Sequence, residues 1–311
     1  MTLLYCGSIF QQHDTGQHPE NAQRLRSIKQ KLSSSDVLAR CRQPEWEPAT
    51  IDQLTLVHRA ELIESVSDFA DSGGGRIEAD TIVSPRSFEV AKSAAGAACN
   101  AVKRVIAGED DSALCLIRPP GHHALPGQPM GFCLLNNVAV AAKYAISQLD
   151  CNQVMIVDWD VHHGNGTQAI FWSDPQVGFV SMHRYPFYPG SGNHDETGSG
   201  DGLGTTLNVP IRFGTSRREQ LDAFRVAVES IAEKIKPELI LISAGFDSHA
   251  QDPIGSLGLE SEDFTELTTI VQNVAQTHAS GRIVSLLEGG YNPDALAESV
   301  DCHLQQLMTD I

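Results

Sequence analysis

Paired cysteines are missing from this 311-residue sequence, which has seven scattered cysteines and no CxxC motif. An odd, dispersed set argues against a disulfide-linked extracellular fold and against a zinc site built on thiolates, and it is typical of a reducing compartment. Long apolar runs are also missing, since none approaches the about 18 residues needed to span a bilayer. The first residues lack the basic region of a signal peptide. We therefore expect a cytoplasmic protein with no membrane partner.

Basic side chains are scarce. The chain has 22 lysines and arginines against 39 aspartates and glutamates, which gives a formal net charge of −17. Such an acidic chain lacks the basic footprint that phosphate demands, so we expect no nucleic-acid partner. The negative charge suits cationic substrates, and it is equally consistent with a role in solubility alone.

Apolar runs of strand length alternate with helical patterns along the chain. Several runs are apolar throughout, as expected for strands buried on both faces of a parallel sheet. The expected strands are Leu3–Cys6, Ala113–Ile117, Val154–Val157, Val177–Met182, Thr206–Val209, Leu239–Ile242 and Ile283–Leu286. The expected helices are Pro19–Leu32, Phe88–Ile106, Asn137–Leu149, Ser216–Ile235, Ser261–Thr277 and Pro293–Leu307. This alternation predicts a single doubly wound α/β domain over residues 1–311.

Reactive side chains cluster directly after five of the expected strands. In open α/β sheets ligands bind at the carboxyl ends of the strands, so clusters that follow several strands meet at one edge. The clusters are Arg118–His123, Asp158–His163, Ser181–His183, Ser243–Asp247 and Glu288–Tyr291. Their shared position indicates one site at that edge of the sheet.

Acidic and histidine side chains after two of these strands have the spacing of metal ligands. Asp158, Asp160 and His162 occupy every second position, and on an extended segment such side chains share one face. Asp160, His162 and Asp247 would offer three oxygen or nitrogen ligands and leave one position open, the pattern of a catalytic zinc site. Taken singly, each aspartate also fits a capping or salt-bridge role, so the prediction depends on the whole set.

Groups suited to proton transfer and oxyanion stabilisation occur in the other clusters. His122 and His123 follow a Pro-Pro-Gly turn, and an imidazole near a metal-bound water can exchange its proton near neutral pH. Tyr291 follows two glycines and is placed to donate a hydrogen bond to a developing oxyanion. Taken alone, the histidines also fit a polar surface, and Tyr291 also fits core packing. Aromatic loops that would wall a tunnel for an aliphatic stem, but that equally fit a core, are Gly131-Phe132 and Phe187-Tyr188.

Together these residues resemble the zinc-dependent histone deacetylase superfamily. The motifs that carry the resemblance are RPPGHHA (Arg118–Ala124), GFC (Gly131–Cys133), VDWDVHHGNGTQ (Val157–Gln168), SAGFD (Ser243–Asp247) and LEGGY (Leu287–Tyr291). Their order, types and spacing agree with the family over most of the chain, and they look most like class II members and bacterial relatives. The resemblance implies an arginase-like α/β fold with an eight-stranded parallel sheet, one zinc per chain and metal-assisted amide hydrolysis.

The resemblance also implies a role for each site residue. Zinc would be held by Asp160, His162 and Asp247. His123 would be the general base and then the general acid, His122 an electrostatic partner tuned by Asp158, and Tyr291 the group that polarises the acyl carbonyl. The acyl-lysine channel would be lined by Gly131, Phe132 and Tyr188, with Asp80 at the rim and Arg24 near an internal acetate cavity. A potassium ion would be held by Asp158, Ser181 and the backbone carbonyls of Asp160, His162 and Met182.

Three positions differ from the commonest family pattern. Asn165 stands where class I members carry an aspartate behind the second histidine, and a neutral amide stabilises an imidazolium less than a carboxylate does. Tyr188 replaces a tunnel phenylalanine and adds a hydroxyl to the wall. Ile254 occupies the gatekeeper position, where a glutamate would mark a polyamine-preferring relative. Tyr291 is retained, unlike in weakly active members that have histidine there.

We therefore predict a deacetylase that acts on N-acetyl or other N-acyl lysine in proteins or peptides. Acetylpolyamines and small acylated metabolites are alternative substrates, and the sequence leaves open the acyl length, the oligomeric state and the choice of zinc over iron. An arginase-like hydrolase would need a second set of metal ligands. A non-catalytic module that binds acylated ligands would be expected to lack His123, Tyr291 or a metal ligand. Neither expectation matches this chain.

Overall fold

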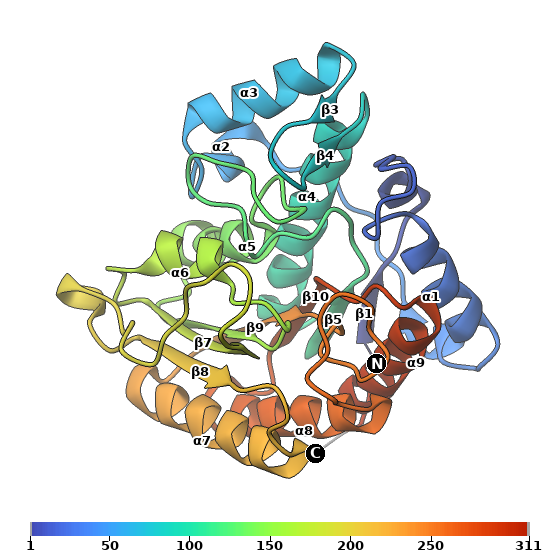
Figure 1. Cartoon of the computed structure of the whole chain (residues 1–311). Coiled ribbons are helices and arrows are strands. Elements are labelled where there is room, and N and C mark those ends of the chain that lie inside the picture. The colour runs from blue at the N-terminus through green and yellow to red at the C-terminus, as the bar shows by residue number, and fades with distance from the viewer. Residues whose placement is uncertain (1, 310–311) are drawn as a thin grey trace.

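An eight-stranded sheet forms the centre of the computed structural model, which describes residues 2–309 (Figure 1). The strand order is β2-β1-β5-β10-β9-β6-β7-β8, and all neighbours are parallel. The strands are β1 (Thr2–Tyr5), β2 (Cys41–Arg42), β5 (Ser112–Cys115), β6 (Val154–Asp158), β7 (Val177–Arg184), β8 (Thr206–Ile211), β9 (Leu239–Ala244) and β10 (Ile283–Leu287). Parallel neighbours need crossover connections, which the helices supply.

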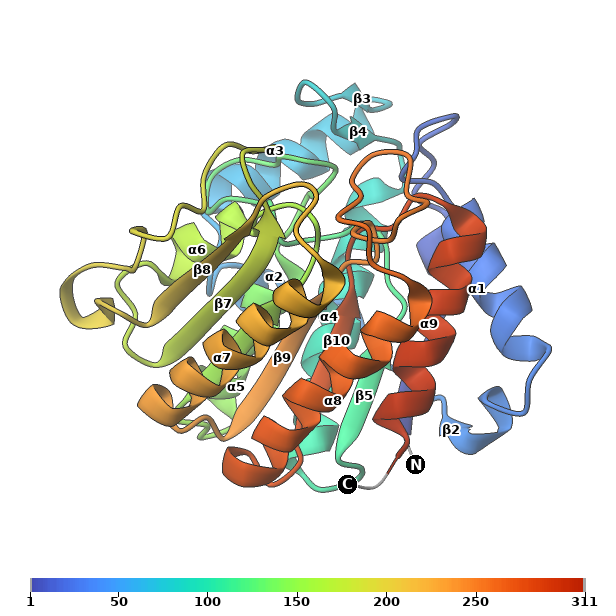
Figure 2. The ribbon, with the colours of Figure 1, turned by 60° about the horizontal axis from the view of Figure 1, so that its bottom comes forward.

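Helices cover both faces of this sheet. On one face α7, α8 and α9 lie side by side and α1 packs against α9, whereas α4 and α5 pack together on the opposite face (Figure 2). The helices are α1 (Gln23–Ser33), α2 (Ile51–Leu54), α3 (Ala60–Asp71), α4 (Ser87–Ile106), α5 (Asn137–Gln148), α6 (Asn165–Phe171), α7 (Arg217–Ile235), α8 (Ser261–His278) and α9 (Pro293–Leu307). Covered on both faces, strands β1, β5, β6, β9 and β10 are buried at every position.

Loops and one small hairpin lie beyond the carboxyl ends of the strands (Figure 2). The hairpin pairs β3 (Gly75–Arg76) with β4 (Ile82–Val83) in antiparallel fashion. Because β3 and β4 are only two residues long, the hairpin depends on packing against neighbouring elements such as α3. This arrangement brings residues 77–81 to the edge of the sheet where the reactive clusters were expected.

The structure confirms the predicted α/β domain with an eight-stranded parallel sheet, and all seven expected strands form. The two-residue strand β2 was not predicted, nor were α2, α3 and α6. The helix expected from Pro19 begins only at Gln23, and Glu20 instead turns its side chain into a buried ion-pair network. The boundaries 1–311 stay a prediction because they reach outside the described range. Over residues 2–309, no helix is both long enough and apolar enough to cross a membrane.

Helix α4 approaches the 47–49 segment so closely that only glycine fits at position 96. A Cβ there would lie 2.1 Å from the carbonyl oxygen of Glu47 and 2.6 Å from the amide nitrogen of Ala49. That segment is itself held, since the Ala49 N–H donates to the carbonyl of Lys92 at 2.8 Å.

We predict that Gly96→Ala destabilises the protein. Alanine is favoured over glycine in a helix interior by about 1 kcal/mol, but overpacking typically costs about 1–3 kcal/mol. The new Cβ would meet backbone atoms, which cannot move aside as a flexible side chain can. We therefore expect the cost of overpacking to exceed the gain in helix propensity. The free energy of unfolding measured by urea titration should therefore fall by about 1 kcal/mol or more. A rise in that free energy would show that the 47–49 segment moves aside at little cost.

Candidate metal centre and active site

The reactive clusters meet at the carboxyl edge of the sheet, as their positions after parallel strands require. The segments after β5, β6, β7, β9 and β10 all contribute. β10, β9, β6 and β7 are consecutive in the sheet, and β5 adjoins β10. Residues far apart in the chain therefore become neighbours through strand order alone.

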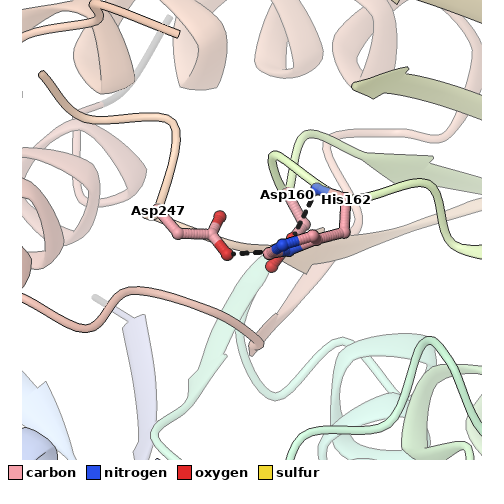
Figure 3. Close-up of side chains that lie close together, drawn as sticks. All are labelled: Asp160, His162 and Asp247. Carbon is pink, nitrogen blue, oxygen red and sulfur yellow. Dashed lines mark hydrogen bonds and ion pairs between the residues drawn. The ribbon is translucent and has the colours of Figure 1, made fainter. Parts of the chain in front are cut away.

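Asp160, His162 and Asp247 lie together just beyond the neighbouring strands β6 and β9 (Figure 3). His162 Nδ1 lies 3.0 Å from Asp160 Oδ1 and 3.2 Å from Asp247 Oδ2. One ligand atom from each residue lies within 4.8 Å of the others, and all three side chains are buried. The two carboxylates and one imidazole thus point at one small space.

The donor set fits a divalent cation. Each carboxylate has one oxygen fixed by backbone, since the Val161 N–H donates to Asp247 Oδ1 at 2.9 Å and the Gly289 N–H donates to Asp160 Oδ2 at 2.8 Å. Within residues 2–309, Asp247 Oδ2 is buried and accepts no hydrogen bond. A Cβ at position 289 would lie 2.2 Å from that oxygen. This oxygen, which faces His162 Nδ1 across 3.2 Å, and the glycine beside it leave space and a ligand for a metal ion.

The charges of Asp160 and Asp247 also favour a divalent cation in this space. Burial, and next the nearby carboxylate of Asp160, raise the pKa of Asp247 to about 7. Two buried carboxylates that share one space resist being ionised together, and a divalent cation between them removes this conflict. The triad therefore has the charge as well as the geometry of a metal centre.

His122 lies against a carboxylate. Its Nδ1 is 3.0 Å from Asp158 Oδ2, and both side chains are buried. Burial disfavours a charged imidazole, but the carboxylates of Asp158 and Asp160 outweigh it and raise the pKa of His122 to about 10. His122 is therefore the cationic member of the histidine pair.

His123 lies against an amide instead. Its Nδ1 is 2.6 Å from Asn165 Oδ1, so Nδ1 carries the proton and Nε2 keeps a lone pair. Burial, followed by the nearby His122 and His162, lowers the pKa of His123 well below its usual value. The two rings lie only 4.0 Å apart between centroids, yet their environments push their charge states in opposite directions.

Glu288 supports the histidine pair from behind, a role that could not be assigned to it from the sequence. Its Oε2 accepts hydrogen bonds from the N–H groups of Gly121 at 2.6 Å and His122 at 3.2 Å. Burial raises the pKa of Glu288 to about 7. This carboxyl fixes the backbone from which both histidines project.

Tyr291 enters the site from the segment after β10. Its ring meets the ring of Phe132 edge-on at 5.7 Å, and the Arg24 guanidinium lies 5.1 Å from its centroid. Burial, and next the Asp247 carboxylate, raise the pKa of Tyr291 well above its usual value. The phenol is thus protonated and available as a hydrogen-bond donor.

Aromatic rings surround the metal triad on its outer side. The ring of Phe187 stacks on His162 at 5.3 Å, and the ring of Tyr188 meets His123 edge-on at 5.3 Å. Tyr188 is 38% exposed, so it lies where the site opens to solvent. Gly131 fits closely on the other wall, because a Cβ there would lie 2.4 Å from the His123 ring.

Asp80 joins this opening through Thr81. The hydroxyl of Thr81 accepts from the Phe132 N–H at 3.1 Å and donates to Asp80 Oδ1 at 3.2 Å. Thr81, which links the hairpin to the aromatic wall, was not predicted from the sequence. The Ile254 N–H donates at 2.9 Å to Asp252, whose carboxylate also accepts from the Tyr291 N–H at 2.7 Å.

Two buried arginines share one carboxylate below Tyr291. Arg118 donates to both oxygens of Glu20, and Arg24 Nη1 donates to Glu20 Oε1 at 3.1 Å. Burial opposes the charge on Glu20, but Arg118 outweighs it and lowers the pKa of the carboxyl to about 2. A buried guanidinium from α1 is thereby fixed beneath the site.

The residues expected to hold potassium also come together. Asp158 and Ser181 are partners in register on β6 and β7, and Met182 follows Ser181. The carboxylate of Asp158 accepts from the Asp160 N–H at 3.0 Å, which turns the chain toward His162. Asp158 at the end of β6 therefore lies beside Ser181 within β7, and Asp160 and His162 follow in the segment after β6.

Comparison with known proteins gives one consistent family. The family model described as "Histone deacetylase domain" matches residues 18–307. "Histone deacetylase 10, chloroplastic" of Oryza sativa subsp. japonica is 38% identical over 315 residues, which cover 96% of this chain and 71% of the relative. The "Histone deacetylase-like amidohydrolase" of Pseudomonas aeruginosa is 39% identical over 276 residues, which cover 88% of this chain and 73% of the relative.

An archaeal relative and a solved structure agree with these matches. A "Probable deacetylase" of Archaeoglobus fulgidus is 38% identical over 277 residues, covering 88% of this chain and 77% of the relative. The crystal structure of the HDA15 HD domain is 33% identical and superposes with a TM-score of 0.92, covering 98% of this chain and 87% of that one.

We predict that Asp247→Ala removes the bound metal while the fold persists. The variant loses a carboxylate whose second oxygen accepts no hydrogen bond and faces His162, and a two-ligand site binds a divalent ion far more weakly. Metal per chain, measured by elemental analysis after dialysis against zinc, should fall from stoichiometric to near background. Circular dichroism should be unchanged. The control is Asp195→Ala, which removes an exposed carboxylate from a loop. Full metal content in Asp247→Ala would reject this ligand set.

Proposed function

This chain belongs to the histone deacetylase family, and from that premise we propose that it is a zinc-dependent enzyme that hydrolyses the amide of N-acetyl or other N-acyl lysine in proteins or peptides. The observation that carries the proposal is the meeting of three elements in one buried site. They are the metal-ligand triad, the neutral imidazole of His123 and the phenol of Tyr291. Relatives named as deacetylases and an amidohydrolase support the hydrolytic class.

Asp160, His162 and Asp247 are the residues that would hold zinc, which when bound acidifies a water molecule and polarises the acyl carbonyl. A set of one imidazole and two carboxylates suits this ion. Three protein ligands leave a position for the reaction, and the two carboxylates balance the double charge of the cation.

A potassium ion is proposed beside the zinc. Asp158 and Ser181 would supply side-chain oxygens, and Asp160, His162 and Met182 would supply backbone carbonyls. The register pairing of Asp158 with Ser181 supports this set, because it brings two oxygen-bearing side chains to one level of the sheet. Oxygen ligands are those that a hard cation prefers.

His123 would remove a proton from the attacking water and later give it to the leaving amine. Its Nε2 lone pair is free because Nδ1 is committed to Asn165, and its neutral state is maintained by burial. His122, whose charge is stabilised by Asp158, would supply positive charge without exchanging the proton. One site thus separates base and electrostatic roles between two identical rings.

Tyr291 would donate a hydrogen bond to the acyl oxygen as negative charge develops on it. The substrate stem would pass between the walls formed by Gly131, Phe132 and Tyr188, with Asp80 and Ile254 at the entrance. The aromatic contacts around His123 and His162 support such a channel. An aliphatic lysine stem buried among rings contributes about 0.8 kcal/mol for each methylene.

The residue at position 254 favours peptide substrates over small amines, whereas the net charge of the whole chain favours small amines. Ile254 provides no carboxylate at the entrance to recognise a polyamine. The net charge of −17 would, however, attract acetylpolyamines, which are the second candidate substrate. A module that only binds acylated ligands is disfavoured because the ligand triad, His123 and Tyr291 are all present. The unpaired cysteines among the described residues support a cytoplasmic setting.

The test is turnover by the purified protein on a matched panel, with elemental analysis of the bound metal. The panel holds acetyl-lysine peptides, peptides with longer acyl chains, and acetylpolyamines. We expect kcat/KM to be highest for an acyl-lysine peptide and zinc to be the metal that supports it. Higher kcat/KM for acetylpolyamines would move the assignment to small amines. Binding of the whole panel with no turnover would overturn the enzymatic proposal.

We predict that Asn165→Asp shifts the acidic limb of the kcat/KM profile to higher pH. A carboxylate beside His123 favours its imidazolium, so the pKa of this base rises from its lowered value. Activity requires the neutral ring and is lost as pH falls through that pKa, so the loss should begin at a higher pH. The shift is measured in the kcat/KM profile of the free enzyme.

Alanine variants of the two histidines serve as the reference for this prediction. His123→Ala should abolish turnover almost completely, whereas His122→Ala should leave a measurable remnant. An acidic limb that stays in place or moves down in Asn165→Asp would show that His123 is not the base.

A further inference from the structure

The peptide group between Gly290 and Tyr291 is held at both of its polar ends. Its carbonyl oxygen, on Gly290, accepts from Arg24 Nε at 2.6 Å. Its N–H, on Tyr291, donates to Asp252 Oδ2 at 2.7 Å. The orientation of one peptide plane therefore depends on two buried side chains from opposite sides of it.

Asp252 is almost fully buried and uses both of its carboxylate oxygens. Oδ1 accepts from the N–H groups of Ile254 at 2.9 Å and Gly255 at 3.0 Å, which closes a tight turn over residues 252–255. We call this turn the entrance loop, because it carries Ile254, which is proposed to lie at the substrate entrance. Oδ2 alone reaches across to Tyr291. One carboxylate thus connects the entrance loop with the segment that carries the phenol.

The need for such a restraint follows from the two glycines before Tyr291. Gly290 has a φ of +121°, in the region that favours glycine, and a glycine pair offers little resistance to rotation of the following peptide. Rotation of that peptide would redirect the Cα–Cβ bond of Tyr291 and swing the phenol. A catalytic group displaced by about 1 Å can lose about 10²-fold in rate.

We propose that Asp252 is a positioning residue for Tyr291, which it orients by holding the Gly290–Tyr291 peptide against Arg24, and that it couples this orientation to the turn carrying Ile254 at the substrate entrance. The inference rests on the proposed function, since Tyr291 is taken there as the donor to the acyl oxygen. Asp252 itself touches no reacting atom. Its effect must therefore pass through the Tyr291 hydroxyl.

The first variant is Asp252→Asn, which keeps size and shape but has one acceptor oxygen in place of two. That oxygen can serve either the turn or Tyr291, and the NH2 group then faces the remaining N–H as a second donor. We expect kcat to fall by about 10²-fold, as for a group moved out of line. KM should change by much less, because the entrance residues remain.

A double-variant cycle tests whether the effect passes through the hydroxyl. Tyr291→Phe alone should lower kcat by about 10²–10³-fold. If Asp252 acts by orienting the phenol, then Asp252→Asn combined with Tyr291→Phe should be no slower than Tyr291→Phe alone, within about threefold. A further loss of about 10²-fold in the double variant would mean that Asp252 only supports the fold, and the proposal would fail.

A second variant keeps the test valid if Asp252→Asn fails to fold. A structural measurement also tests the restraint without relying on enzymatic activity. Asp252→Ser can still close the local turn through its hydroxyl but is too short to reach Tyr291. In either variant, amide hydrogen exchange in the peptide covering residues 288–293 should accelerate, while bound zinc stays stoichiometric. Unchanged exchange there would also refute the restraint.

The matched control is Asp294→Asn, which removes an exposed carboxylate three residues after Tyr291. Its kcat should stay within about twofold of the parent. A large loss of kcat in Asp294→Asn would show that loss of negative charge alone explains the effect of Asp252→Asn, and the positioning role would be rejected. Failure of the parent protein to turn over any acyl-lysine substrate would instead overturn the proposed function. The hydrogen-exchange measurement would still show whether Asp252 restrains the Gly290–Tyr291 peptide.

Discussion

Two buried carboxylates that cannot move apart are the constraint around which this site is arranged. Asp160 and Asp247 follow neighbouring strands, and a backbone N–H holds one oxygen of each in place. Their remaining oxygens face one space in a medium where unbalanced charge is costly. A divalent cation would balance them, so one geometry accounts both for the choice of these side chains and for the metal proposed between them.

The two histidines show how strongly a single neighbour decides the behaviour of a side chain. Both rings are buried and they lie in contact, so burial disfavours charge on each. Only His122 has a carboxylate, Asp158, at its Nδ1, and that partner outweighs the cost of burial. His123 has the amide of Asn165 in the same place and stays neutral. The difference lies in one atom of the partner side chain.

Much of the fold and of the site was predictable because both depend on short-range patterns. Apolar runs marked the strands, and the meeting of Asp160 with Asp247 was predictable because parallel strands end at a common edge. Thr81, Asp252 and Glu288 could not be assigned in this way, since each acts on a backbone group remote in sequence. The turn after Asp252 has a local signature, but nothing in the sequence shows which distant N–H its second oxygen would reach.

The restraint on the Gly290–Tyr291 peptide joins the two ends of the chain, because Arg24 belongs to α1 and Tyr291 follows β10. During synthesis the amino-terminal helix leaves the ribosome long before the last strand has been made. The contact therefore has a very long sequence separation and closes late, after much loop entropy has been lost. Strand β10 lies between β5 and β9, and the Gly289 N–H that holds Asp160 follows it directly, so the last segment of the chain completes both the sheet edge and the restraint on Tyr291.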